Sequence, residues 1–157
     1  MPRNVLFAVA VLTLSAVAIA QNTNEVLKLS KDEQEMITLT NLERKTAGLK
    51  PLTPNSKLMA AARTHAANMA QLEMLEHTLN CKTPADRAKD AGYTYGWLGE
   101  NIAWNQQSPK EVVESWMNSE GHKANILKEE ATEIGVAVAK NTKGEPYWVQ
   151  VFGKPLR

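Results

Sequence analysis

The chain has 157 residues and a formal net charge of +1 at pH 7, with 43% hydrophobic and 22% charged residues. This length predicts one domain that is large enough to bury an ordinary core. The balanced charge, with no basic stripe and no polybasic cluster, argues against a nucleic-acid partner and against electrostatic attachment to an anionic membrane.

The first twenty residues have the features of a secretory signal peptide. Arg3 supplies a short positive region, an apolar run extends from Val5 to Ala20, and Ala18-Ile19-Ala20 fits the pattern that signal peptidase cleaves. The run is short for a membrane span, which needs about 20 apolar residues. We therefore expect a secreted protein, extracellular or periplasmic, without stable membrane insertion. It is divided into a signal peptide (1–20), a flexible leader (21–29) and one domain (30–157).

Cys81 is the single cysteine of the sequence. One cysteine cannot close a disulfide within the chain, so stability must come from packing or from a bound metal. The thiol is either inert and partly buried or able to join two chains. We expect an inert thiol and a monomeric protein.

The N-terminal half of the domain has helical patterning. Ser30 and Glu33 fit a capping box, which begins a helix that Gly48 ends. A second helix, from Asn55 to about Glu73, carries apolar residues on one face and is rich in alanine. His65 lies within that apolar stripe, so we interpret it as a structural residue rather than a ligand.

The second half combines short helices with strands. Helices are expected at Pro84–Asp90 and Pro109–Ser119, the latter after a capping box in Ser108–Glu111. Apolar residues then alternate over Glu133–Ala139, a turn follows, and Tyr147–Phe152 supplies the antiparallel partner. Helices followed by a hairpin predict an α+β layered fold.

Three polar segments carry the candidate chemistry. Each places one ionisable side chain beside a residue that stops or bends the backbone: His77 in Leu75–Thr78, Glu100 in Gly99–Ile102 and His122 in Gly121–Asn125. Two imidazoles and a carboxylate suit a divalent metal, or the polar lining of a cleft. Glu100 has an alternative role as a buried carboxylate that accepts backbone amides and holds a loop.

The sequence around these segments resembles the CAP superfamily, or SCP domain, of cysteine-rich secretory proteins, antigen 5 and pathogenesis-related proteins, and most of all its short bacterial members. The resemblance runs from about Glu35 to Phe152 and rests on these phrases: Asn41–Arg44, Leu58–Ala62, His65-Ala66, His77-Thr78, Gly99–Ala103, Trp116–Ser119, Gly121–Leu127, Thr132–Val136 and Trp148–Phe152. It implies a three-layer α-β-α sandwich with a central antiparallel sheet and a cleft on one face.

The resemblance also implies a set of cleft residues, because two histidines and two acidic residues line the cleft in that family. His77 and His122 match the histidines, and Glu100 matches the first acid. The position of the second acid holds Ser119 in this chain, so the set is incomplete as written. Glu133, at the start of the strand that follows the His122 segment, is the candidate substitute.

Three functional hypotheses stay open. Relatives bind lipids or sterols, or act at cell envelopes, which implies a secreted ligand-binding or interaction module for a lipid, an envelope component or another extracellular partner. An apolar ligand groove would then use four aromatic residues, whose alternative role is core packing: Tyr93, Tyr95, Trp97 and Trp104. Another hypothesis is a purely structural domain.

The remaining hypothesis is a divalent-metal-dependent hydrolase or protease. His77, His122 and one carboxylate, with Glu100 the matching acid, would hold zinc or another divalent cation, which lowers the pKa of a bound water to ~7. Neither a His-Glu-x-x-His motif nor a Gly-x-Ser-x-Gly motif is present in the sequence. The binding module is therefore favoured over the enzyme.

Overall fold

A computed structural model describes residues 27–156 of the chain. The expected signal peptide and most of the leader lie outside these residues, so the division of the N-terminus stays a prediction. The elements follow in this order: α1 (Lys31–Thr46), β1 (Thr53–Pro54), α2 (Ser56–Leu72), α3 (Pro84–Asp90), β2 (Tyr95–Trp104), α4 (Pro109–Met117), α5 (Glu120–Ile126), β3 (Glu133–Lys140) and β4 (Pro146–Pro155).

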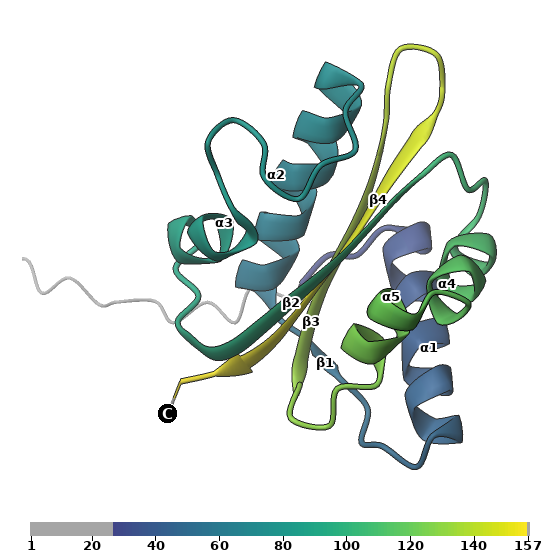
Figure 1. Cartoon of the computed structure of the whole chain (residues 1–157), viewed down its shortest axis with the longest axis vertical. Coiled ribbons are helices and arrows are strands. Elements are labelled where there is room, and N and C mark those ends of the chain that lie inside the picture. The colour runs from purple at the N-terminus through teal and green to yellow at the C-terminus, as the bar shows by residue number, and fades with distance from the viewer. Residues whose placement is uncertain (1–26, 157) are drawn as a thin grey trace, which may run out of the picture.

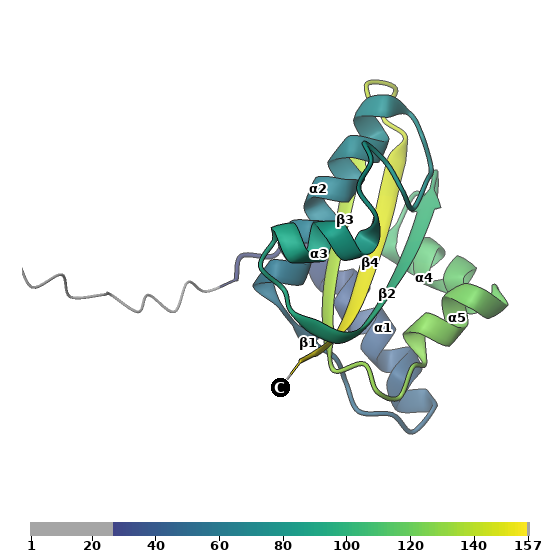
Figure 2. The ribbon, with the colours of Figure 1, turned by 60° about the vertical axis from the view of Figure 1, so that its left-hand side comes forward.

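These elements form three layers, with a twisted sheet in the middle (Figure 1). Helices α2 and α3 cover one face of the sheet, and α1, α4 and α5 cover the other, as the turned view in Figure 2 also shows. The α+β sandwich expected from the sequence is confirmed. No helix within residues 27–156 is both long and apolar enough to cross a membrane.

The sheet has the strand order β1-β3-β4-β2. The expected hairpin of β3 and β4 is antiparallel, and β2 pairs antiparallel with the other side of β4. The sheet is nevertheless mixed rather than antiparallel throughout, because the two-residue β1 runs parallel to β3. The connection from α1 to α2 passes the edge of β3, where the N–H groups of Thr53 and Asn55 donate to the carbonyls of Thr132 and Ile134 at 3.0 and 2.9 Å.

The helix starts agree with the sequence in most places. At α1 the Ser30 hydroxyl accepts from the Glu33 amide, and the Glu33 carboxylate accepts from the Ser30 amide, so that capping box is complete. At α4 Ser108 caps the helix, but the Glu111 carboxylate accepts from the Gln107 amide instead, which leaves the expected box half formed. Helix α5 begins at Glu120, so that His122 lies in its first turn.

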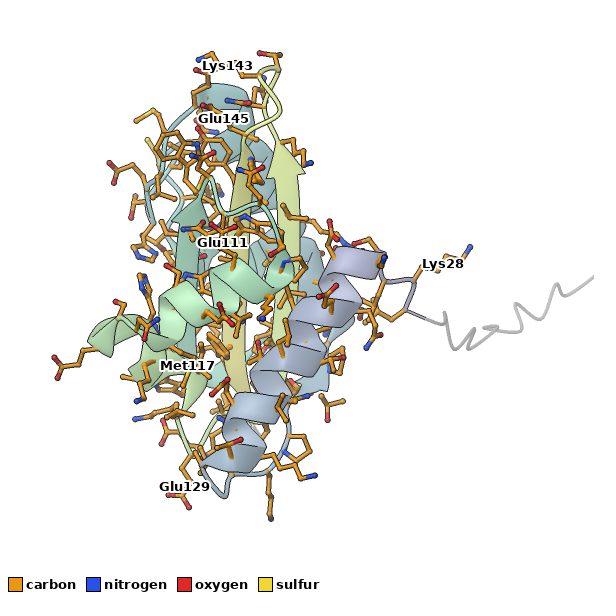
Figure 3. The ribbon with its side chains drawn as sticks, turned by 90° about the vertical axis from the view of Figure 1, so that its right-hand side faces the viewer. Lys28, Glu111, Met117, Glu129, Lys143 and Glu145 are labelled. Atoms are coloured by element: carbon orange, nitrogen blue, oxygen red, sulfur yellow. The ribbon has the colours of Figure 1, made fainter. Side chains whose placement is uncertain are left out.

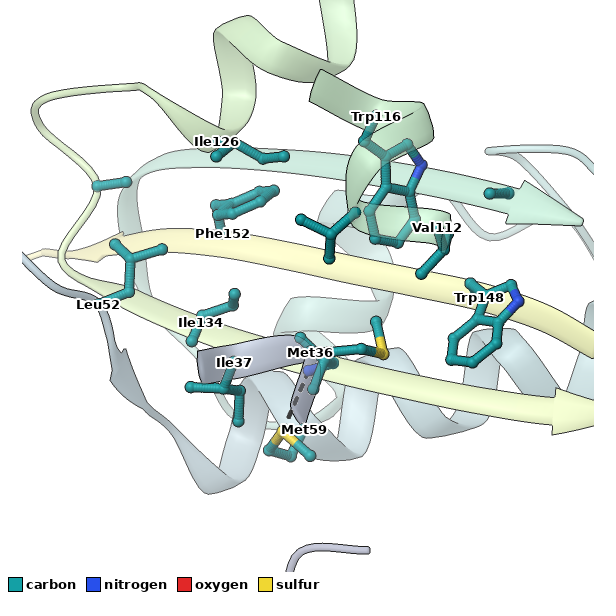
Figure 4. Packing of buried hydrophobic residues seen from close by; sticks show 14 residues of the cluster. Met36, Ile37, Leu52, Met59, Val112, Trp116, Ile126, Ile134, Trp148 and Phe152 are labelled. Atoms are coloured by element: carbon teal, nitrogen blue, oxygen red, sulfur yellow. Dashed lines mark hydrogen bonds between the residues drawn. The ribbon is translucent and has the colours of Figure 1, made fainter. Parts of the chain in front are cut away.

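Two apolar clusters fill the space between the layers. Figure 4 shows the cluster under α1, α4 and α5, where Trp116 and Phe152 are almost fully buried. On the other face, α2 packs so closely on β3 that a Cβ at Gly135 would lie 2.1 Å from the Leu58 backbone. Both clusters keep the sheet rigid between the two helical layers.

Charged side chains and the single cysteine lie at the surface of the domain. Figure 3 shows Glu111 and Met117 on α4, and Lys143 with Glu145 at the tip of the β3–β4 hairpin. Cys81 is unpaired and exposed, not partly buried as expected, because it lies in a turn outside the packed layers.

Candidate functional site

Glu100 is the centre of the candidate site. It lies on the edge strand β2, and its side chain is on the face that α2 and α3 cover, in the same register as buried Ile102. Only 2% of the side chain is exposed. One carboxylate oxygen, Oε2, accepts from Nη2 of Arg87 at 2.8 Å, and the other, Oε1, contacts Nδ1 of His77 at 2.9 Å. A buried carboxylate needs such charged partners to offset its lost hydration.

His77 lies in the loop that follows α2, where Glu73 in a left-handed conformation ends the helix. Arg87 fixes this loop, because it donates to the His77 carbonyl at 2.9 Å and to the Lys82 carbonyl at 2.8 Å. An ionised carboxylate can only accept, so the His77–Glu100 contact places the imidazole proton on Nδ1. The Nε2 atom is then an acceptor on a side chain that is 52% exposed.

His65 lies next to this contact and is fully buried. Its Nε2 atom is 3.7 Å from Oε1 of Glu100, which is too long for a hydrogen bond, and neither ring nitrogen has a partner within the described residues. Burial lowers the pKa of His65 to about 4, against the opposing attraction of Glu100. His65 is therefore neutral at pH 7 and is a buried packing residue next to Glu100.

His122 enters the site from the other helical layer, on α5. Two asparagines bind its segment to β2: Asn101 donates to the His122 carbonyl at 3.1 Å, and Asn125 donates to the Glu100 carbonyl at 3.1 Å and to the Asn101 side chain at 2.9 Å. Burial lowers the pKa of the His122 imidazole, and the electrostatic interaction with His77 lowers it further. The structure thus brings His77 and Glu100 into contact and ties the His122 segment to β2 at Glu100 and Asn101.

Glu133 has a different partner. Its carboxylate accepts a hydrogen bond from the Tyr93 hydroxyl at 2.6 Å, at the start of β3. Burial raises the pKa of Tyr93, and this hydrogen bond raises it further. The structure therefore does not bring Glu133 to the His77–Glu100 contact. Ser119, at the position of the missing acid, is the N-cap of α5 and makes no capping hydrogen bond with its side chain.

The four aromatic residues of the expected ligand groove are divided between different places. Tyr93 and Tyr95 line a small cavity of about 340 Å³ beside α3. Trp97 packs in the cluster of α1, α4 and α5, with the Lys128 ammonium 5.7 Å from its ring centroid. Trp104 lies at the far end of β2, where its ring centroid is 6.4 Å from that of Tyr147. They do not form one continuous groove.

The residues fit a metal ion only in part. A metal-bound histidine commonly donates its second ring nitrogen to a carboxylate, as His77 does to Glu100. However, both Glu100 oxygens already bind His77 and Arg87. Within residues 27–156, no group of three or more His, Cys, Asp or Glu side chains is placed to hold a metal. Two imidazoles do not make the three-ligand site that a hydrolytic zinc requires.

Arg87 is the residue of this site that the sequence did not reveal. It lies on the short helix α3, yet only 5% of it is exposed. An arginine at an inward position of a short amphipathic helix is the one sequence signal for such a role, because arginine is seldom buried unless it is paired.

The sequence profile of the cysteine-rich secretory protein family (CAP) matches residues 37–152. An uncharacterized Bacillus subtilis protein, YkwD, is 38% identical over 142 residues, which cover 87% of this chain and 54% of YkwD. The chain thus spans about half the length of that relative.

Solved structures show the same fold. An extracellular protein containing an SCP domain from Bacillus anthracis has a TM-score of 0.73 and 27% identity, and the match covers 78% of this chain and 40% of that one. An outer surface protein from Borrelia burgdorferi has a TM-score of 0.76 and 24% identity, and the match covers 83% of this chain and 97% of that one. NaASP2, whose structure contains Zn²⁺, is similar in fold alone. It has a TM-score of 0.58 and 15% identity, and the match covers 80% of this chain and 81% of that one.

Proposed function

Because this chain belongs to the cysteine-rich secretory protein (CAP) family, we propose that it is an extracellular domain that binds an amphiphilic ligand, a lipid of a cell envelope, beside His77. The similar proteins described as extracellular or outer-surface support this location. The observation that carries the proposal is a group of exposed apolar side chains that leads directly to the half-exposed imidazole of His77.

The apolar half of the proposed site is the end of α2 and the residues after it. Leu72, Met74 and Leu75 are 44%, 46% and 43% exposed, although large apolar side chains gain free energy on burial. Neighbouring exposed apolar side chains are characteristic of surfaces that bind a partner or a membrane. Acyl chains would cover these three side chains.

The polar half of the proposed site is the pair of imidazoles. Glu100 and Arg87 hold His77 in one orientation, so its Nε2 atom is available without a loss of side-chain freedom on binding. The lowered pKa of His122 keeps its imidazole neutral near pH 7. A neutral His122 and the Nε2 acceptor of His77 suit the uncharged hydroxyl or ester groups of a lipid head better than a strongly charged head group.

Vesicle flotation tests this proposal. The protein is mixed with vesicles of phosphatidylcholine, with and without phosphatidylglycerol. The Met74→Ser, Leu75→Ser double variant is expected to bind at least about tenfold more weakly, since each side chain would lose ~1 kcal/mol of burial. Leu42→Ser is the matched control. Leu42 is also an exposed leucine, at 54% exposure, but it lies on α1 in the other helical layer. Equal binding by all three proteins, or no binding by the unmodified one, would contradict a lipid ligand.

A metal-dependent hydrolase is the second candidate, and the His77–Glu100 hydrogen bond is the observation in its favour. Zinc, when bound, would supply a water of lowered pKa. Calorimetric zinc titration, with a His77→Ala, His122→Ala double variant as control, separates the two candidates. We expect no stoichiometric binding at micromolar zinc, because the site offers two imidazoles and no free carboxylate. Tight binding that the double variant loses would restore the hydrolase hypothesis.

A further inference from the structure

A separate cavity of about 430 Å³ lies between α2 and α3; we call it the α2–α3 cavity. Ala60 and Ala61 of α2 and Ala91, directly after α3, form part of its lining. Their short side chains leave room between the two helices that larger residues would fill. The volume is within the range of small-molecule sites, which is about 300–1,000 Å³.

Arg87 also lines the α2–α3 cavity, and it is buried, since only 5% of it is exposed. Its two terminal nitrogens donate to the carbonyls of Lys82 and His77 and to the Glu100 carboxylate. Its Nε–H group, in contrast, has no partner within the described residues. A buried N–H group without an acceptor is unfavourable, so an acceptor atom brought by a ligand would remove that cost.

The rest of the lining is rich in hydrogen-bond donors. The Lys82 ammonium has three N–H groups, and Asp90 accepts from it at 3.0 Å, so two remain. The Asn68 side-chain amide adds two more. Among the described residues of the lining, Asp90 is the only carboxylate, against two cationic side chains. Asp90 and Glu100 pair with the two cations, so the feature that favours a carboxylate, a group that only accepts hydrogen bonds, is the surplus of donors.

We propose that the α2–α3 cavity is a binding site for a small carboxylic acid with an apolar body. The carboxylate lies between Arg87 and Lys82, and the apolar body packs against Ala60, Ala61 and Ala91. This site is distinct from the lipid surface proposed beside His77, and the two share only Arg87, which holds the His77 loop from one side and lines the cavity from the other.

Alanine-methyl NMR tests the proposal at the level of single residues. Benzoate is the probe, and benzamide, which has the same ring but no charge, is the control ligand. We expect benzoate to shift the methyl signals of Ala60, Ala61 and Ala91 in a saturable way, with a dissociation constant on the order of 1 mM for so small a ligand. Ala124, on α5 in the other helical layer, should not respond. Benzamide should bind at least about tenfold more weakly, because it lacks the charged acceptor.

Two exposed alanines of α2 provide a matched pair of variants. Ala60→Phe fills the cavity and should abolish the benzoate shifts of Ala61 and Ala91, whereas Ala67→Phe, in a different cavity of the same helix, should leave them unchanged. Arg87→Lys keeps the charge but removes the Nε–H donor, and should weaken benzoate binding at least about fivefold if the variant folds. The proposal is wrong if no saturable shift occurs, if benzamide binds as tightly as benzoate, or if Ala60→Phe still binds.

Discussion

Glu100 and Asn101 are neighbours in β2, yet their side chains lie on opposite faces of the sheet and join networks of different character. Asn101 belongs to a neutral network: it donates to the His122 carbonyl and to Gln150, accepts from Asn125, and Gln150 in turn donates to Thr40. Glu100 belongs to a charged network with Arg87 and His77, next to neutral His65.

The two networks differ in how completely their atoms are paired. Within the described residues, every buried side-chain polar atom of the Asn101 network has a partner, whereas both His65 nitrogens and the Arg87 Nε atom have none. A fully paired neutral network stabilises the fold and rigidifies it. Of these unpaired groups, His65 is fully buried, whereas Arg87 lines the α2–α3 cavity, where a ligand can supply an acceptor. We infer that Asn101 serves the structure and that Glu100 serves the site.

Removal of the Asn101 side chain should have the largest effect on stability. Asn101→Ala leaves a buried group of Gln150 and half-buried groups of His122 and Asn125 without their partner, which should lower the free energy of unfolding by ~3 kcal/mol. Urea unfolding at pH 7.5 measures this loss. A loss below ~1 kcal/mol would show that water replaces the amide and that the network is not structural.

Acid should destabilise the charged side of the sheet through His65. Its pKa of about 4 in the folded protein lies below the 6.5 of an unfolded histidine, so the unfolded chain takes up the proton first as the pH falls. This contribution to stability is complete above about pH 6.5 and is lost as the pH falls toward 4. Between pH 7.5 and 4.5 the loss is roughly 2–3 kcal/mol.

The control for this pH dependence is His65→Gln, which has no titratable group at that position. Its free energy of unfolding should change less over the same pH range, by the amount that His65 contributes. If the two proteins lose the same stability on acidification, His65 is not the group responsible.

The smallest effect on stability is expected at His77. Its side chain is half exposed, and Arg87 still pairs with Glu100 without it, so His77→Ala should cost ~1 kcal/mol or less. Vesicle binding should weaken in the same variant, because His77 belongs to the proposed ligand site. A loss of more than ~2 kcal/mol would instead assign His77 to the structure, as the hypothesis of a purely structural domain requires.

Much of the fold was predictable because local signals determine it. The Ser30 capping box, the alanine-rich α2 and the β3–β4 hairpin follow from short-range patterns that the structure confirms. Strand β2 was not predictable in this way, because Gly96, Gly99 and the polar pair Glu100-Asn101 interrupt its apolar alternation. Its pairing with β4 is a tertiary contact that overrides local propensity.

The candidate site was predictable to a smaller extent. The sequence named His77, Glu100 and His122, and the structure brings the first two into contact. It did not foresee Arg87, because the partner of a buried carboxylate depends on how α3 packs against the sheet. Nor did it place Glu133, whose hydrogen bond to Tyr93 is formed across a long sequence separation.

Long-range ¹H–¹⁵N NMR of the histidine rings tests most directly whether Glu100 orients His77. At a pH of about 9, well above the ordinary range of histidine titration, the rings are neutral and their tautomers can be read. The hydrogen bond to Glu100 predicts that His77 carries its proton on Nδ1 and leaves Nε2 free for a ligand. A His77 ring protonated on Nε2 would contradict this orientation, since Glu100 would then not hold the imidazole.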